Sequence, residues 1–259
     1  MTLSKPPISK EYGAWASILT AFAAGSGVAW RVNFESFLLF LGALSFFLAR
    51  MPLLGILRSK SFGKIDGSNF IRYWNWFMLY SLTGTILFSI LLFKYKLIAL
   101  FIFIILSLAI FSYNVYVTYD KGPRSNGASF SGILGVSLLS SFTCYVATGY
   151  LNSVTATLWI LVFLYLAGGI LYVRARLGEP GWKACFIFHV VTTVIVGILG
   201  MFKFIPTLSI IAYCPSFVKS LMGAVCADRE TVAKKIGRME LVHSLIYIIL
   251  MVMVYHIGF

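Results

Sequence analysis

The sequence predicts an all-α membrane protein, a polytopic bundle of about nine transmembrane helices with the N-terminus in and the C-terminus out. Three observations support this fold class. Hydrophobic residues make up 60% of the 259 residues and charged residues only 11%, whereas soluble domains are about 25% charged. The apolar residues form runs close to the roughly 20 residues that cross a bilayer. The positive charges between these runs are distributed asymmetrically.

Each expected span is an apolar run bounded by polar or charged residues. The stretches 97–112 and 185–202, for example, contain no Asp, Glu, Lys or Arg. The short connections predict antiparallel neighbours within one integral membrane domain, residues 1–259. In chain order the expected spans are 12–30, 36–57, 73–93, 97–118, 128–150, 156–173, 184–202, 206–224 and 240–258.

The basic residues predict the orientation of these spans. Of the 21 Lys and Arg residues, 17 lie in the N-terminal segment or in the even-numbered connections with their adjoining helix ends. The other four lie on the opposite side: Arg31, Lys94, Lys96 and Lys203. Because basic residues concentrate on the cytoplasmic side of a membrane, we expect the N-terminus inside, the C-terminus outside and a location in the cytoplasmic membrane. Tryptophans near the predicted span ends fit interfacial belts: Trp30, Trp74, Trp76, Trp159 and Trp182.

The net charge of +13 would suggest nucleic acid on a soluble protein. Here the charges form short clusters between apolar runs, so we expect the lipid bilayer as partner and no nucleic acid. The four cysteines are isolated and lie mostly inside apolar segments, which predicts core packing. Since the sequence contains no aspartate-rich pair, zinc pattern or phosphate loop, we predict no cofactor.

Charged residues near membrane depth are the first candidates for a functional site, because burying them without a partner is unfavourable. Arg50 lies inside the second apolar run, two residues before Pro52. The proline removes a backbone donor, so we expect a broken helix end with a guanidinium beside free carbonyls. The alternative is an arginine that extends to the cytoplasmic surface.

Further cationic side chains stand at the ends that we place in the cytoplasm, and arginine forks suit phosphate and carboxylate groups. We therefore expect these cations to form a basic mouth, a cytoplasmic opening that binds an anionic head group. The alternative is that the positive-inside bias alone explains most of these charges, without any ligand. The candidates are Arg50, Arg58, Arg72, Lys121, Arg124, Arg174, Arg176 and Lys219.

The remaining titratable groups fit structural roles. We expect Glu11 and Glu240 to cap the first and ninth spans, where a carboxylate complements the helix dipole. His189 lies within the seventh span and is the best candidate among the histidines, because an intramembrane polar group needs a partner.

Short motifs along the whole chain resemble those of YwiC-like membrane proteins, in the same order. The first is Glu-Tyr-Gly-Ala-Trp at 11–15, where the family pattern has His in place of Tyr12. The others are Ala-Arg-Met-Pro-Leu-Leu at 49–54, Arg-Ser-Asn at 124–126, Leu-Tyr-Val-Arg-Ala-Arg at 171–176 and Lys-Lys-Ile-Gly-Arg-Met-Glu at 234–240. The resemblance implies a multi-pass membrane protein without an assigned reaction. These motifs add Glu11, Trp15 and Asn126 to the candidate substrate-binding residues.

The number of spans and the long cytoplasmic connections also resemble UbiA-like prenyltransferases. Those enzymes hold a prenyl diphosphate through magnesium, using aspartate-rich motifs after the second and sixth spans. The corresponding places here carry Arg50 and Arg58, and Arg174 and Arg176. A magnesium site needs several oxygen ligands, so the resemblance implies the architecture while the sequence does not support magnesium.

Three functions remain open from the sequence. The first is binding or modification of an isoprenoid or phospholipid with an anionic head group; as an enzyme, the protein would be a prenyltransferase-like lipid transferase. The second is a transporter of lipids or small molecules, and the third is a membrane scaffold or accessory subunit. The oligomeric state is not predicted.

Overall fold

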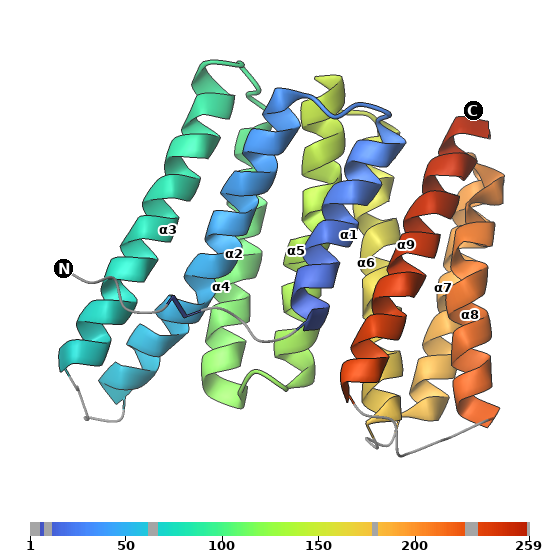
Figure 1. Ribbon diagram of the computed structural model, residues 1–259. Helices are drawn as coiled ribbons and strands as arrows, with labels where there is room; N and C mark the ends of the chain where they lie inside the picture. Colours follow the sequence, from blue (N-terminus) through green and yellow to red (C-terminus); the bar gives the residue numbers. More distant parts are fainter. Residues whose placement is uncertain (1–5, 8–11, 62–66, 178–180, 226–232, 258–259) are drawn as a thin grey trace. The chain divides into compact units, whose positions relative to one another are not determined.

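The computed structural model describes residues 6–7, 12–61, 67–177, 181–225 and 233–257. Within these ranges the chain forms nine α-helices and no strand (Figure 1). The helices are α1 (Tyr12–Val28), α2 (Phe34–Ser61), α3 (Gly67–Phe93), α4 (Leu100–Lys121), α5 (Asn126–Thr148), α6 (Ser153–Arg176), α7 (Trp182–Met201), α8 (Ile210–Val225) and α9 (Ala233–Ile257). The predicted all-α fold with nine helices is therefore confirmed.

Seven of these helices are long and apolar enough to cross a membrane: α2 to α7 and α9. The other two are apolar but shorter. Helix α1 has 17 residues, and α8 has 16 residues and follows a 3₁₀ turn at Thr207–Ser209. At about 1.5 Å per residue, each reaches somewhat less than the hydrocarbon thickness of roughly 30 Å. The chain is thus a multi-pass membrane protein, and the crossing of α1 and α8 stays a prediction.

The expected helix break at Arg50 and Pro52 is wrong. Helix α2 runs without interruption from Phe34 to Ser61 and contains Pro52 in its interior. A proline removes one intrahelical hydrogen bond, and inside a membrane protein packing against neighbouring helices offsets that loss. Helix α8 contains Pro215 in the same way.

The chain divides into two compact units. Unit 1 comprises residues 1–11 and 32–135, and unit 2 comprises residues 12–31 and 136–259. Helices α2, α3 and α4 thus belong to unit 1, and α1 and α6 to α9 to unit 2. Helix α5 begins in unit 1 and ends in unit 2. Each unit is described by itself below, and the single membrane domain stays a prediction.

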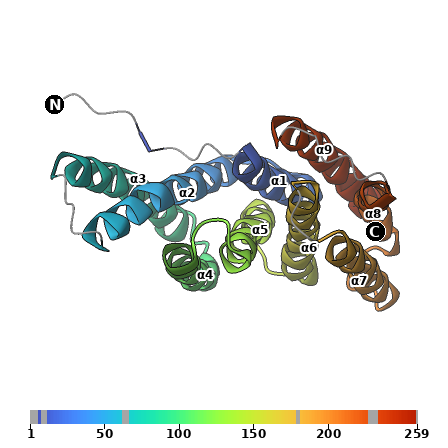
Figure 2. The same cartoon turned by 90° about the horizontal axis from the view of Figure 1, so that it is seen from below.

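Glycines bring helices α2 and α3 of unit 1 close together, side by side in Figure 2. A Cβ atom on Gly84 would come within 2.8 Å of the Phe46 ring, and one on Gly55 within 2.9 Å of the Tyr73 ring. Small residues allow such close approach of helices in membranes. The neighbouring α4 is joined to the start of α5 through Asn114, whose amide donates to the Ala128 carbonyl at 2.7 Å and to Ser131 Oγ at 2.8 Å.

Unit 2 packs α9 against α1 and α8, and α7 against α6 and α8 (Figure 2). A Cβ atom on Gly25 of α1 would lie 2.3 Å from the Ser140 carbonyl oxygen of α5. At the far end of α1, the Trp30 ring meets the His256 ring edge-on, with centroids 4.2 Å apart. Asn152 starts α6 by accepting a hydrogen bond from the Thr155 amide at 2.8 Å, which is the usual role of an N-cap asparagine.

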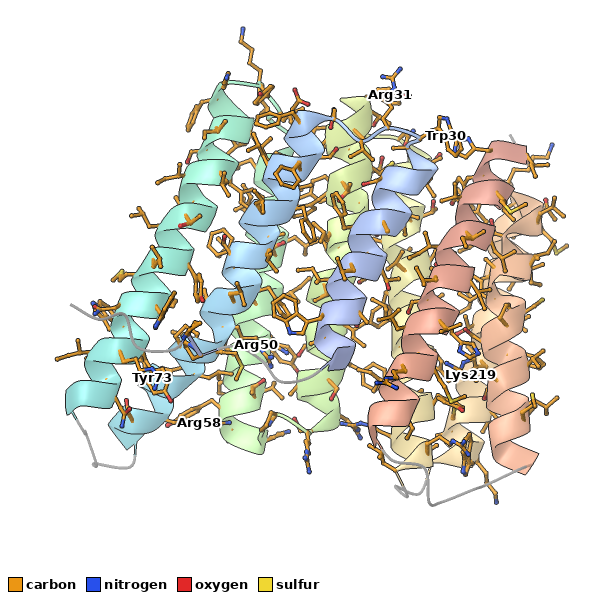
Figure 3. All side chains as sticks on the ribbon, in the orientation of Figure 1. Trp30, Arg31, Arg50, Arg58, Tyr73 and Lys219 are labelled. Carbon is orange, nitrogen blue, oxygen red and sulfur yellow. The ribbon has the colours of Figure 1, made fainter. Side chains whose placement is uncertain are left out.

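Basic residues follow the helix ends within each unit. In unit 1, Arg58 lies at the C-terminal end of α2, the end that α4 shares, and Lys94 lies beyond the C-terminus of the antiparallel α3. In unit 2, Figure 3 shows Trp30 and Arg31 at one end and Lys219 toward the other. Basic side chains predominate at one end of each unit, as the charge distribution predicts. The direction in which those ends face across the membrane stays a prediction.

Replacement of Gly25 tests the close contact between α1 and α5. We expect Gly25→Ala to lower the stability of the protein by about 1–3 kcal/mol, because the new methyl group overlaps the backbone of α5. Thermal unfolding in mild detergent measures the loss. The matched control is Gly197→Ala in α7, where a Cβ atom meets no atom within 4 Å. Equal stability of the two variants would contradict the contact.

Reporter fusions test the orientation of the chain and the crossing of α8, one of the two short helices. We expect alkaline phosphatase fused after residue 257 to be active, because nine crossings place the C-terminus outside. Fusions after residues 176 and 225 should be inactive, since both connections lie on the basic side. An inactive fusion at the C-terminus together with an active one after residue 225 would show that α8 does not cross as predicted.

Candidate functional site

The candidate residues from the sequence divide between the two units. Unit 1 contains Arg50, Arg58, Arg72, Lys121, Arg124 and Asn126. Unit 2 contains Trp15, Arg174, Arg176, His189 and Lys219. Glu11 lies outside the described residues. A basic mouth shared by all of these residues stays a prediction, and the structure shows two separate groups of contacts.

An open groove lies between α2 and α4 in unit 1, with a volume of about 370 Å³. We call it the α2–α4 groove. Its lining is almost entirely apolar or aromatic: Leu53, Leu57, Phe111, Ser112, Val115, Tyr116 and Tyr119. These residues belong to the C-terminal halves of two helices that run in the same direction, so the groove lies toward the basic end of the unit.

A hydrogen bond from Arg50 joins α2 to α4, the two helices that form the groove. The Arg50 guanidinium donates this hydrogen bond from Nη2 to Thr118 Oγ1 at 3.1 Å. Thr118 is fully buried, and its neighbour Tyr119 lines the groove. Figure 3 places Arg50 on α2 with Arg58 closer to the end of that helix. Arg50 is therefore half-buried within a continuous helix, and its extension to the cytoplasmic surface stays a prediction.

Exposed cations stand beyond the basic end of the groove. Arg58 follows the groove residue Leu57, and Lys121 and Arg124 follow Tyr119; all three cations are exposed. Gly122 and Pro123 form a turn between these cations: Gly122 has φ +85°, and Ser125 donates to its carbonyl at 3.0 Å. Asp120 is also exposed here, so the rim carries one carboxylate among its cations.

Two candidate residues of unit 1 lie outside the groove lining. Asn126 is the exposed first residue of α5, and Arg72 is half-buried in the first turns of α3. Neither lines the groove. The sequence analysis in turn missed Asn114, a buried amide that ties α4 to α5. The position of this amide within an apolar run could have marked it as a residue that needs a hydrogen-bond partner.

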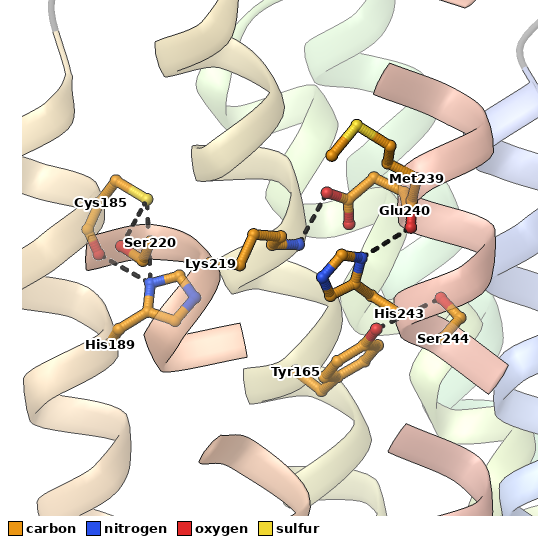
Figure 4. Close-up of polar contacts among 9 residues, drawn as sticks. All are labelled: Tyr165, Cys185, His189, Lys219, Ser220, Met239, Glu240, His243 and Ser244. Carbon is orange, nitrogen blue, oxygen red and sulfur yellow. Dashed lines mark hydrogen bonds and ion pairs between the residues drawn. The ribbon is translucent and has the colours of Figure 1, made fainter. Parts of the chain in front are cut away.

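Unit 2 contains an ion pair inside the helix bundle. Lys219 Nζ of α8 lies 2.7 Å from Glu240 Oε1 of α9, and the two side chains are only 5% and 15% exposed. Figure 4 shows the Lys219 side chain directed at the Glu240 carboxylate. The Lys219 ammonium also lies 4.4 Å from the centre of the Tyr172 ring of α6, a cation–π distance.

Helix α6 makes room for this pair. A Cβ atom on Gly169 would lie 3.2 Å from Glu240 Oε2, and one on Gly168 would lie 3.0 Å from His189 Nε2. The guanidinium of Arg176 reaches the Tyr172 hydroxyl one turn earlier on the same helix. Arg176 thus lies close to the pair, on the side toward the end of α6.

A second polar group lies beside the pair on α7. Cys185 Sγ is 3.4 Å from Ser220 Oγ of α8 and 3.8 Å from His189 Nδ1, and the same His189 nitrogen is 2.8 Å from the Cys185 carbonyl oxygen. Both Cys185 and His189 are buried. The expectation that His189 needs an intramembrane partner is met by a backbone carbonyl one turn away.

The expected capping role of Glu240 is wrong. Glu240 lies in the eighth position of α9, which begins at Ala233, and its carboxylate accepts from Lys219. A carboxylate complements the helix dipole only within the first turn. This pairing could not be predicted from the sequence, because 21 residues separate the two partners and they lie on different helices. The signal was a lone cation and a lone carboxylate in neighbouring apolar runs.

Among the residues that the structure describes, no three His, Cys, Asp or Glu side chains lie together as metal ligands. The two candidate sites therefore differ in chemistry. The α2–α4 groove offers an apolar surface beside exposed cations, whereas unit 2 offers a buried charge pair with hydroxyl and imidazole neighbours.

The comparisons with known proteins identify a family. A family model described as YwiC-like protein matches residues 8–144, which is more than half of the chain. The match covers α1 to α4 and most of α5. No curated protein and no solved structure matches the chain.

Removal of one partner tests the ion pair. We expect Lys219→Met to lower the free energy of unfolding by about 3–5 kcal/mol, because Glu240 would remain buried without its partner. The double variant Lys219→Met/Glu240→Leu should lose less than the single variant, since it removes both charges. Unfolding in mixed micelles measures both, with the exposed Lys203→Met as the control. A double variant that loses the sum of the two single losses would contradict the pairing.

Proposed function

The chain belongs to the YwiC-like family, and we propose that it binds an isoprenoid or other lipid with an anionic head group in the cytoplasmic membrane. The observation that carries the proposal is the α2–α4 groove, an apolar surface that leads toward exposed cations. The lipid tail lies in the groove, and its head group lies at the basic rim formed by Arg58, Lys121 and Arg124.

The size and lining of the groove suit a lipid tail. Its volume of about 370 Å³ is within the roughly 300–1,000 Å³ of ligand pockets. Leu53, Leu57 and Phe111 offer apolar contacts, and Tyr116 and Tyr119 offer aromatic rings with polar tips. The groove is open and lies between two apolar helices, so a lipid that entered it from the bilayer would stay in apolar surroundings.

The chemistry of the rim suits phosphate. Arginine presents several N–H donors in a planar fork that matches phosphate oxygens, and lysine adds a point charge. A head group with two or more negative charges gains most from three nearby cations, even beside Asp120. We therefore favour a lipid phosphate over a zwitterionic head group.

The proposal is a binding activity rather than a transfer reaction. The magnesium-dependent chemistry of UbiA-like prenyltransferases needs aspartate-rich motifs, and the sequence has arginines in those places. Direct contact between cations and phosphate takes over the role of the metal in holding the head group.

Transport is a second candidate, favoured by the interior of unit 2. Helix α7 buries Cys185, His189 and Thr192, whereas it exposes Val190 and Val194. A buried face that is more polar than the lipid-facing one is typical of helices that line a path for polar solutes.

Native mass spectrometry tests lipid binding. The protein is incubated with a polyprenyl monophosphate in magnesium-free buffer with a chelator. We expect binding that weakens by about tenfold or more in Arg58→Ala/Lys121→Ala, because charged hydrogen bonds contribute roughly 1.5–3 kcal/mol each. The matched control is Lys94→Ala/Lys96→Ala, which removes two exposed cations at the opposite end of unit 1.

A groove variant separates the tail from the head group. We expect Ser112→Trp to weaken binding without a change in charge, because the indole ring fills the groove. Equal binding of the uncharged polyprenol, or equal loss in the control variant, would overturn the proposal. Competition by phosphatidylglycerol identifies a phospholipid as the better ligand.

A further inference from the structure

Buried polar groups follow one face of α9 in unit 2. Glu240, Ser244, Tyr247 and Tyr255 recur at intervals of three, four or eight residues, which places them on the same side of the helix. Ser244, Tyr247 and Tyr255 are buried, and the Glu240 side chain is 15% exposed. The opposite face carries Val242, Leu245, Ile249 and Met253, all exposed. The polar groups of α9 thus face protein and its apolar groups face lipid.

Hydroxyl groups from α6 and α8 meet this face. Tyr165 of α6 donates to Ser244 Oγ at 3.4 Å, one turn from Glu240 (Figure 4). The Tyr165 and Tyr247 rings stack with centroids 3.8 Å apart. Tyr247 Oη is 3.4 Å from Tyr213 Oη of α8, which donates to the Leu161 carbonyl at 2.7 Å. Two pairs of hydroxyl groups, joined by the stacked rings of Tyr165 and Tyr247, therefore follow Glu240 along this face of α9.

Glu240 is the one group in this series that ordinarily carries negative charge. The groups that face it from the neighbouring helices are Lys219 of α8, Tyr165, Tyr172 and Arg176 of α6, and Cys185 of α7, with His189 of α7 and His243 of α9 nearby. Among the described residues of unit 2, Lys219 is the cation in direct contact with the carboxylate. A buried pair of this kind contributes little net stability compared with apolar residues, and intramembrane ionisable groups typically mark proton or ion pathways.

We propose that Glu240 is a proton-exchange site within the membrane. Hydronium from the basic end donates a proton to the Glu240 carboxylate, an O–H bond forms, and water leaves. The neutral carboxylic acid is no longer attracted to the ammonium group by charge, and Lys219 remains over the electron-rich face of the Tyr172 ring. Loss of the proton to water restores the ion pair.

Two features of the site support reversible exchange. The Glu240 side chain keeps a small exposed fraction, whereas Lys219 is almost fully enclosed. Gly169 leaves space beside Oε2, the oxygen that does not accept from Lys219 and where a proton would reside. The inference concerns unit 2 and holds whether or not the α2–α4 groove binds a lipid.

Infrared difference spectroscopy of the full chain in lipid bilayers tests the proposal. Because all eight Asp and Glu residues give carboxylic acid C=O absorption on acidification, we expect one C=O band that shifts in D2O to be missing from the difference spectrum of Glu240→Gln. The matched control is Glu35→Gln in the first turn of α2, which should keep the band. In Lys219→Met the band should appear at higher pH than in the natural protein, because the cation that favours the carboxylate is gone.

The double variant Lys219→Met/Glu240→Leu is the control for misfolding of the single variants, because it lacks both charges. We expect it to keep the helical circular dichroism spectrum and to lack the C=O band assigned to Glu240. Persistence in Glu240→Gln of the C=O band assigned to Glu240 would overturn the proposal. So would a Glu240 that stays ionised at every pH at which the protein remains helical, because the pair would then be a permanent structural link.

Discussion

The hydrocarbon interior of a membrane provides no water for backbone N–H and C=O groups, and every other feature of the chain depends on this constraint. Each spanning segment must satisfy its own backbone, which an α-helix does. The constraint also explains why Pro52 and Pro215 lie inside continuous helices. One missing donor is tolerated where neighbouring helices pack closely, while a broken helix would leave several polar groups without partners.

The same constraint determines how side chains are arranged. In unit 1, glycines let α2 and α3 approach closely, and the buried amide of Asn114 joins α4 to α5. In unit 2, the contacts between α6, α8 and α9 are polar: an ion pair, tyrosine hydroxyls and serines. Because lipid tails are as apolar as leucine, helices gain little by burying apolar faces, and close packing and hydrogen bonds hold them together. Both means of association occur in each unit, since Gly25 also packs closely in unit 2 and Arg50 also donates to Thr118 in unit 1.

The sequence predicted the fold more fully than the sites. Runs of apolar residues gave all nine helices, with most ends within a few residues, because helix formation under the membrane constraint is a local property. The sequence marked Arg50 as a charge within an apolar run, but its partner Thr118 lies 68 residues away. Glu240 was assigned to a cap because its neighbours in sequence are basic, whereas its partner Lys219 approaches from another helix. The N-in orientation, the UbiA-like architecture and lipid binding stay predictions.

The sequence by itself determined that the chain is a helical, multi-pass membrane protein and that its basic residues gather at alternate helix ends. Hydropathy and charge act locally, so they can be read along the chain. Only the tertiary structure decided which charges meet. It paired Lys219 with Glu240, placed Tyr172 and Gly169 beside them, and left Arg58 exposed beyond an apolar groove. Such pairings depend on the rotation and packing of whole helices, which no local pattern of residues specifies.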